Sequence, residues 1–145
     1  MKRKTYDPIL RVQPWRVMAV FQPLERVLAR LEIDGTVDTD GRQVVFKEGT
    51  REDWYDLPAA IRGVAQFHDL AGRHGVAVDV TPLERFANKL EAGSPVFEQD
   101  IETVKKCINA CWQQALMLRE SQATSLLETV RISEAMDDLE GRKAA

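Results

Sequence analysis

The sequence predicts a mainly α fold: a helical bundle with one small β-hairpin and a long C-terminal helix or helical hairpin. Apolar residues recur at three- and four-residue steps, Asp-Gly pairs punctuate a β-branched run within residues 34–48, and residues 96–140 contain neither Gly nor Pro. A chain of 145 residues with 44% apolar content fits one domain with a real core. We expect a helical head over residues 1–93, with the hairpin at about 35–47, and a C-terminal helical region over 94–145.

Residues 14–31 predict an amphipathic helix that Pro23 interrupts. Proline lacks the amide hydrogen that would bond four residues back, here to Ala19. We therefore expect two short helices, with Pro23 in the first turn of the second, and a single kinked helix is the alternative. The apolar face consists of Val17, Phe21, Leu24, Leu28 and Leu31.

Residues 34–48 predict the β-hairpin, which turns near Asp40 and Gly41. The acidic and polar side chains before Gly41 have the spacing of the first ligands of a calcium loop. That loop would place Lys47 at its twelfth position, where an acidic ligand is required. We therefore interpret these side chains as turn residues and expect no metal there.

Residues 50–71 predict two consecutive helices. Thr50 and Asp53 resemble a capping pair for a short helix through Trp54 and Tyr55. A longer helix then begins near Pro58, because proline suits the first turn. Its inward face is Ile61, Val64, Phe67 and Leu70.

A capping pair and two glycines predict the next helix boundaries. We expect Gly75 to end the longer helix in a left-handed conformation. Thr81 and Glu84 then form the clearest capping box in the chain, around Pro82. Gly93 ends the helix that they begin.

The C-terminal region carries a seven-residue repeat of apolar positions, which predicts a helix seam. One continuous helix over residues 96–140 would be on the order of 60 Å long, whereas a break at the polar stretch 119–125 would give a helical hairpin. Ser125 and Glu128 are a candidate capping box for the second helix, and both alternatives remain open. The predicted interface residues on the seam are Ile101, Val104, Ile108, Cys111, Ala115, Leu118, Ile132, Met136 and Leu139.

The two cysteines, Cys107 and Cys111, lie on the apolar side of this seam. A zinc site needs two further ligands, but the only histidines, His68 and His74, are six residues apart and face different ways on a helix. We expect His68 at the boundary between core and surface and His74 in a C-terminal cap. The cysteines are therefore predicted to be core residues, and no metal or cofactor is expected.

Catalytic motifs are weak. The sequence has no G-x-S-x-G elbow and no Gly-rich phosphate loop. Glu52, Asp53 and Asp56 are close enough in sequence to share a metal, which makes a small metal-dependent hydrolase the third hypothesis. A helix start favours the same carboxylates for electrostatic reasons, so catalysis is the less favoured answer.

Charge is distributed unevenly. Residues 1–31 contain seven basic and two acidic residues, a net charge of +5, so that the rest of the chain carries −8 of the overall −3. This basic arm and the hairpin make a DNA-binding regulator the second hypothesis. Its candidate contacts are Lys2, Arg3, Lys4, Arg11 and Arg16.

The favoured hypothesis is a non-catalytic protein-interaction module, of a regulatory or adaptor kind. It would self-associate, or bind another protein, through the apolar face of its C-terminal helices. No apolar stretch approaches the roughly eighteen residues that a membrane helix requires, and the basic start does not continue into an export signal. We therefore expect a cytoplasmic protein that does not bind membranes.

Overall fold

The computed structural model describes residues 10–47 and 54–130 of the chain. Its first helix, α1 (Pro14–Asp34), is continuous through Pro23, so the predicted break there is wrong. Phe21 and Leu24, on either side of the proline, are both buried, and the packing of this face holds the helix together. Ala19, whose carbonyl loses its usual donor, is exposed, where water can satisfy it.

The predicted hairpin is present and belongs to a three-stranded antiparallel sheet, ordered β1-β2-β3. Strands β1 (Asp38–Asp40) and β2 (Gln43–Lys47) are joined by a two-residue turn in which Gly41 has φ +64°, as tight hairpin turns favour. The third strand, β3 (Trp54–Asp56), lies where we predicted a short helix through Trp54 and Tyr55, and that prediction is wrong. Pairing with β2 outweighs the local capping signal, whose residues Thr50 and Asp53 lie outside the described part of the chain.

Helix α2 (Leu57–Ala71) follows β3 directly and ends in a short 3₁₀ turn, η1 (Gly72–His74). The Asp56 carboxylate caps its start by accepting a hydrogen bond from the Ala59 amide, 2.9 Å away. Gly75 follows the 3₁₀ turn with φ 176°, which is extended backbone. The predicted left-handed helix end at Gly75 is therefore wrong, because the 3₁₀ turn already unwinds the helix before it.

Helix α3 (Thr81–Ala92) begins where predicted, but with a different cap. The Asp79 carboxylate accepts hydrogen bonds from both the amide and the hydroxyl of Thr81, at 3.0 and 2.6 Å. Thr81 is already helical and does not form the predicted capping box with Glu84. Gly93 ends the helix in the left-handed conformation, as expected, with φ +67°.

Helix α4 (Glu98–Met117) ends at an extended residue, Leu118, and a further helix covers residues 120–130. The single continuous helix is therefore wrong. The break, at residues 118–119, falls at the start of the predicted stretch 119–125. Ser125 lies inside the second helix, where its carbonyl accepts from the Thr129 hydroxyl, so it does not begin that helix. The Gln122 side chain instead accepts a hydrogen bond from the Arg119 amide, at 3.0 Å, as a residue in the first turn of a helix can.

The chain breaks between α4 and the next helix although no Gly or Pro lies there, and pairing with residues 10–12 explains this break. The Val12 amide donates to the Leu118 carbonyl at 3.1 Å, and the Glu120 amide donates to the Leu10 carbonyl at 3.0 Å. Arg11 and Arg119 face each other in this short antiparallel bridge. The segment that pairs with the break, residues 10–12, lies more than one hundred residues away from it in sequence.

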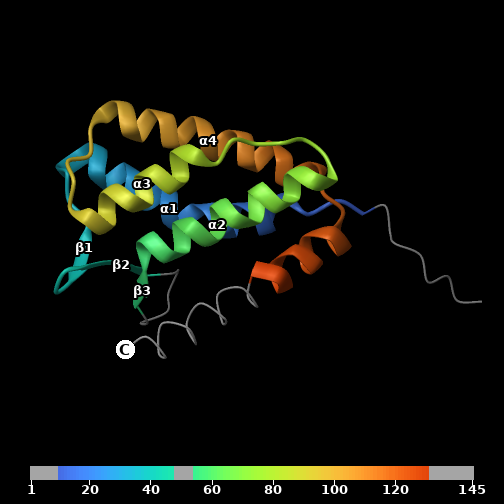
Figure 1. The fold of residues 1–145 in the computed structure, drawn as a ribbon, viewed down its shortest axis with the longest axis horizontal. Helices are drawn as coiled ribbons and strands as arrows, with labels where there is room; N and C mark the ends of the chain where they lie inside the picture. Colours follow the sequence, from blue (N-terminus) through green and yellow to red (C-terminus); the bar gives the residue numbers. More distant parts are fainter. Residues whose placement is uncertain (1–9, 48–53, 131–145) are drawn as a thin grey trace, which may run out of the picture.

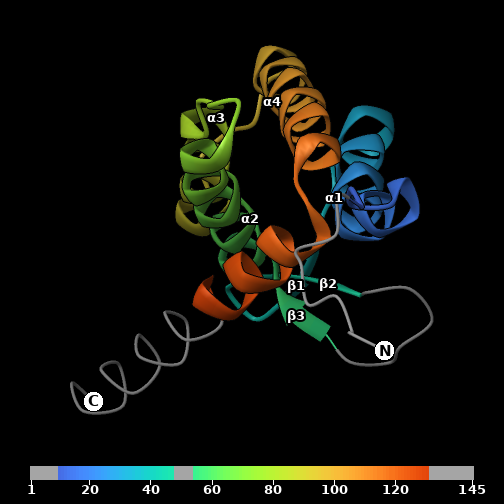
Figure 2. The same cartoon turned by 90° about the vertical axis from the view of Figure 1, so that its right-hand side faces the viewer.

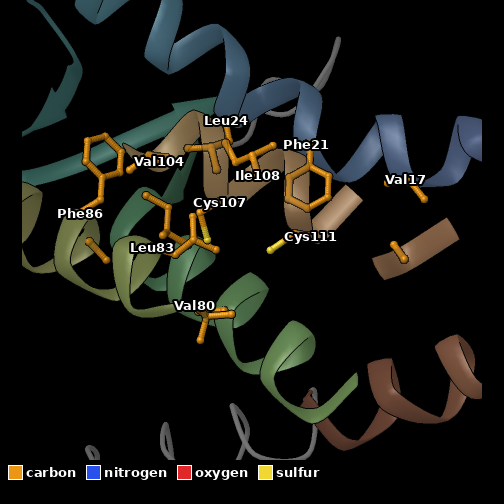
Figure 3. Close-up of a cluster of buried hydrophobic side chains, with 14 of the residues drawn as sticks. Val17, Phe21, Leu24, Val80, Leu83, Phe86, Val104, Cys107, Ile108 and Cys111 are labelled. Carbon is orange, nitrogen blue, oxygen red and sulfur yellow. The ribbon is translucent and has the colours of Figure 1, made fainter. Parts of the chain in front are cut away.

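The helices enclose one core. Helix α2 packs mainly on α3, and α1 packs on α4, which runs antiparallel to it; Figures 1 and 2 show these pairs side by side. The sheet covers the end of the bundle where α1 finishes and α2 begins. The turn at residues 118–119 lies at the opposite end (Figure 1). Figure 3 shows core side chains from α1, α3 and α4 in contact, among them Phe21, Leu83, Phe86, Val104 and Ile108.

Candidate functional site

A cavity of about 460 Å³, partly open to solvent, lies between α1, α2, the end of α4 and the helix over residues 120–130. The break at Leu118 creates it, because the chain turns there and lays the last described helix beside the N-terminal half of α1 and the middle of α2. Its walls are almost entirely apolar. They include Val17, Val20, Phe21, Val64, Phe67 and Leu127.

One polar ring, that of His68, forms part of this apolar wall. His68 is 2% exposed, so the prediction that it lies at the boundary between core and surface is wrong. Its ring stacks on Phe21, with centroids 5.5 Å apart, and meets Phe67 edge-on at 5.0 Å. His68 follows Ile61 and Ala65 on the apolar face of α2, which places it inside the bundle.

Gln114 of α4 fixes the position of the His68 ring. Its Oε1 lies 2.7 Å from His68 Nδ1, and its Nε2 donates to two carbonyls, those of His68 at 3.0 Å and Val76 at 2.7 Å. Gln114 is itself buried, and through Val76 it also holds the linker between η1 and α3. This one side chain therefore joins α4, α2 and the linker.

The same hydrogen bonds determine the protonation of His68. Because both amide hydrogens of Gln114 are used on carbonyls, its Oε1 must accept, and His68 Nδ1 must carry a proton and donate. Burial lowers the pKa of His68 below its ordinary value, so the ring is neutral at pH 7. A neutral ring with its proton on Nδ1 has a free lone pair on Nε2.

Two arginines lie at the N-terminal side of the cavity. Arg16 lines it and forms an ion pair with Glu120 at the start of the last described helix. Arg11 donates to the Met117 carbonyl at the end of α4. Both guanidinium groups therefore fasten the turn at 118–119 to the N-terminal segment.

A second concavity, a groove of about 430 Å³, lies on the outer surface between α1 and α4. Its lining includes Glu25 from α1 and Lys105, Trp112 and Gln113 from α4. Trp112 packs beside Phe21, with ring centroids 6.2 Å apart, and is half-buried. The groove therefore combines polar and apolar lining residues with one aromatic side chain.

The predicted interface residues fall into two groups. Ile101, Val104, Ile108, Cys111, Ala115 and Leu118 are all buried in the core of the single chain. Other elements of the same chain cover these six side chains, so they do not form an exposed seam. Ile132, Met136 and Leu139 lie outside the described residues.

Both cysteines lie inside the core, and Figure 3 shows their sulfurs among the apolar side chains. Cys107 is within hydrogen-bond distance of the Asp79 carbonyl, at 3.4 Å. A hydrogen bond with Cys107, together with burial, raises the pKa of the Cys111 thiol far above its ordinary value. Cys111 therefore stays protonated and behaves as a small apolar side chain.

Of the residues proposed for the two alternative functions, the structure describes Arg11, Arg16 and Asp56. Of the DNA-contact candidates, Arg11 and Arg16 make the contacts just described, and Lys2, Arg3 and Lys4 lie outside the described residues. Of the hydrolase candidates, Asp56 caps α2 and also accepts from Gln43, whereas Glu52 and Asp53 lie outside that part of the chain. Within residues 10–47 and 54–130, no three His, Cys, Asp or Glu side chains are grouped closely enough to hold a metal ion.

Sequence reasoning missed the pairing of His68 with Gln114. A signal was present, since each is a polar residue on the apolar face of its helix: His68 in line with Ile61 and Ala65, and Gln114 three residues after Cys111. Two such residues on different helices are candidates for a buried hydrogen bond, because a buried polar group needs a partner.

None of the helices in the described part of the chain is long and apolar enough to cross a membrane. No protein family, curated protein sequence or solved structure matches this chain.

Proposed function

We propose that the chain is a non-catalytic, cytoplasmic protein-interaction module that self-associates through the outer surface of α1 and α4. The observation that carries this proposal is the exposure of two methionines beside the α1/α4 groove: Met18 is 50% exposed and Met117 57% exposed. Methionine is flexible and adapts to irregular apolar surfaces, which suits a contact surface. Grouped exposed apolar side chains mark interaction sites more often than single ones do.

Helix periodicity places both methionines along the groove. Met18 precedes the lining residue Glu25 by two turns of α1, and Met117 follows the lining residue Gln113 by one turn of α4. Because the two helices are antiparallel, both positions fall towards the same end of the groove. Trp112, half-buried in the groove wall, lies towards that end as well.

The positions of the two methionines favour a second copy of the chain as the occupant. A two-fold symmetric contact that brings α1 of one copy against α4 of the other sets Met18 of each copy beside Met117 of the second copy. Lys105, at the far end of the groove, already pairs with Glu32 of its own chain. The surface is therefore apolar and self-complementary.

Light scattering of the full chain over a concentration series tests the proposal. We expect a dimer that dissociates on dilution, and we expect Met18→Glu with Met117→Glu to weaken it by roughly tenfold or more, since each introduces a charge into the apolar part of the contact. Ile33→Glu is the matched control, because Ile33 is 84% exposed in the last turn of α1, away from the methionines. Circular dichroism verifies that each variant remains folded.

A chain that stays monomeric at every concentration would contradict self-association. A dimer that Ile33→Glu weakens as much as the methionine substitutions do would place the contact elsewhere.

A further inference from the structure

We propose that the cavity around His68 binds a small, mostly apolar molecule that carries one hydrogen-bond donor, such as a phenol or an indole. The proposal concerns a site separate from the α1/α4 groove. It rests on three features of the described residues. These are the size and apolar walls of the cavity, the lone pair on His68 Nε2, and the ion pair of Arg16, which lines the cavity, with Glu120.

The cavity has the dimensions and lining of a ligand site. Its volume of about 460 Å³ is many times that of a water molecule. Pockets for small organic ligands have volumes of roughly 300–1,000 Å³ and are mainly apolar with a few polar groups. Here the apolar walls come from α1, α2, the end of α4 and the helix over residues 120–130, and His68 supplies a polar atom.

The polar atom is an acceptor. Gln114 holds the proton of His68 on Nδ1, and no residue within 10–47 or 54–130 hydrogen-bonds to Nε2. The His68 ring lines the cavity, stacked on Phe21 and edge-on to Phe67, and Nε2 is not among the fully buried unpaired atoms, so a molecule in the cavity can reach its lone pair. A ligand with a hydroxyl or an N–H group satisfies it, and a hydrocarbon of the same shape does not.

The pairing of Arg16, the charged residue in the cavity wall, argues against an anionic ligand. Arg16 is already paired with Glu120, so its charge is neutralised within the chain. A carboxylate ligand offers only acceptors, which the lone pair of His68 repels. A metal ion is also disfavoured, since the described residues include no group of three His, Cys, Asp or Glu side chains that could hold one.

Calorimetric titration of the full chain with phenol and with toluene tests this assignment. The two probes have almost the same shape, but only phenol donates a hydrogen bond. We expect phenol to bind with one-to-one stoichiometry and roughly tenfold more tightly than toluene, the ratio that corresponds to one net hydrogen bond. In His68→Phe this preference for phenol should disappear.

A second variant fills the cavity without altering His68. Leu127 is half-buried in the cavity wall, so Leu127→Trp can project a larger side chain inward without replacing a core residue. We expect it to abolish binding of both probes while the protein remains folded. Leu116→Trp, at a half-buried position of α4 that does not line the cavity, is the matched control and should bind both probes as the wild type does.

Three results would overturn the proposal. Failure of both probes to bind the full chain would show that the space is closed or is filled by the chain itself. Equal affinity for phenol and toluene would remove the role of His68. Binding that survives Leu127→Trp would place the probes elsewhere.

Discussion

The two ends of α4 differ in how closely they are packed. Its N-terminal two thirds pack against α1 and α3 through side chains such as Val104, Ile108 and Cys111, which fill the interior. Its C-terminal end instead carries Gln114, bonds to a buried histidine and borders a cavity of about 460 Å³. Tight packing stabilises a fold, whereas unfilled apolar space forgoes contacts that would stabilise it. The interior side chains of the first region therefore maintain the fold, and the second region is the better candidate for binding a small molecule.

The largest expected effect is that of a charge in the packed region. Ile108→Asp buries a carboxylate that has no partner, which costs about 4 kcal/mol or more and removes most of the stability of a domain of this size. The neighbouring Asn109 is exposed, so Asn109→Asp should change the free energy of unfolding by less than about 0.5 kcal/mol. Urea denaturation measures both. A folded but dissociated Ile108→Asp protein would mean that this seam joins two chains.

Truncation of one leucine in each region compares the two directly. Leu83→Ala, at a fully buried site on α3, should cost about 3–4 kcal/mol, because it leaves a new void in close-packed surroundings. Leu127→Ala should cost only about 1 kcal/mol, since that side chain already borders empty space. Equal losses in urea denaturation would contradict the distinction between the regions.

His68, in the region beside the cavity, should make the stability of the protein depend on pH. The unfolded chain binds a proton at His68 near pH 6.5, whereas burial lowers the pKa in the folded chain. The unfolded state therefore binds more protons between these two pKa values, and stability falls as pH drops below 6.5 until the lower pKa is passed. The slope attributable to one proton is at most about 1.4 kcal/mol per pH unit. In His68→Phe this contribution should vanish, and an unchanged slope would show that His68 is not buried in neutral form.

The smallest expected effect concerns the turn that separates the two regions. Gln122→Ala removes the side-chain acceptor for the Arg119 amide and should cost about 0.5–1 kcal/mol. The exposed Thr124 lies on the same helix, and its hydroxyl bonds only back to the Glu120 carbonyl, so Thr124→Ala is a suitable control with a smaller effect. Replicate urea denaturation curves, compared by their midpoints, distinguish the two variants.

Local sequence patterns predicted the fold class well and the interruptions of the helices poorly. The helical bundle, the hairpin turn at Gly41 and the helix end at Gly93 follow from apolar periodicity and from backbone conformations that glycine favours. The break after Met117 depends on pairing with residues 10–12, a contact between distant parts of the chain that no window around residue 118 contains. The strand Trp54–Asp56 depends in the same way on its partner β2.

The candidate site was predictable only in part. The sequence shows that His68 and Gln114 are polar residues on the apolar faces of α2 and α4. Which of them meet, and which atom of the imidazole remains free, follows from the packing of α2 on α4 and from two carbonyls that orient the amide of Gln114. The cavity itself arises from the turn at residue 118.

Methyl carbon NMR of the full chain under xenon pressure tests the difference between the two regions most directly, because xenon enters dry apolar cavities and avoids close-packed interiors. The account predicts that the methyl resonances of Val20, Val64 and Leu127 shift with xenon pressure while those of Leu83 and Val104 do not. Shifts of equal size in both groups, or no shift in either, would contradict it.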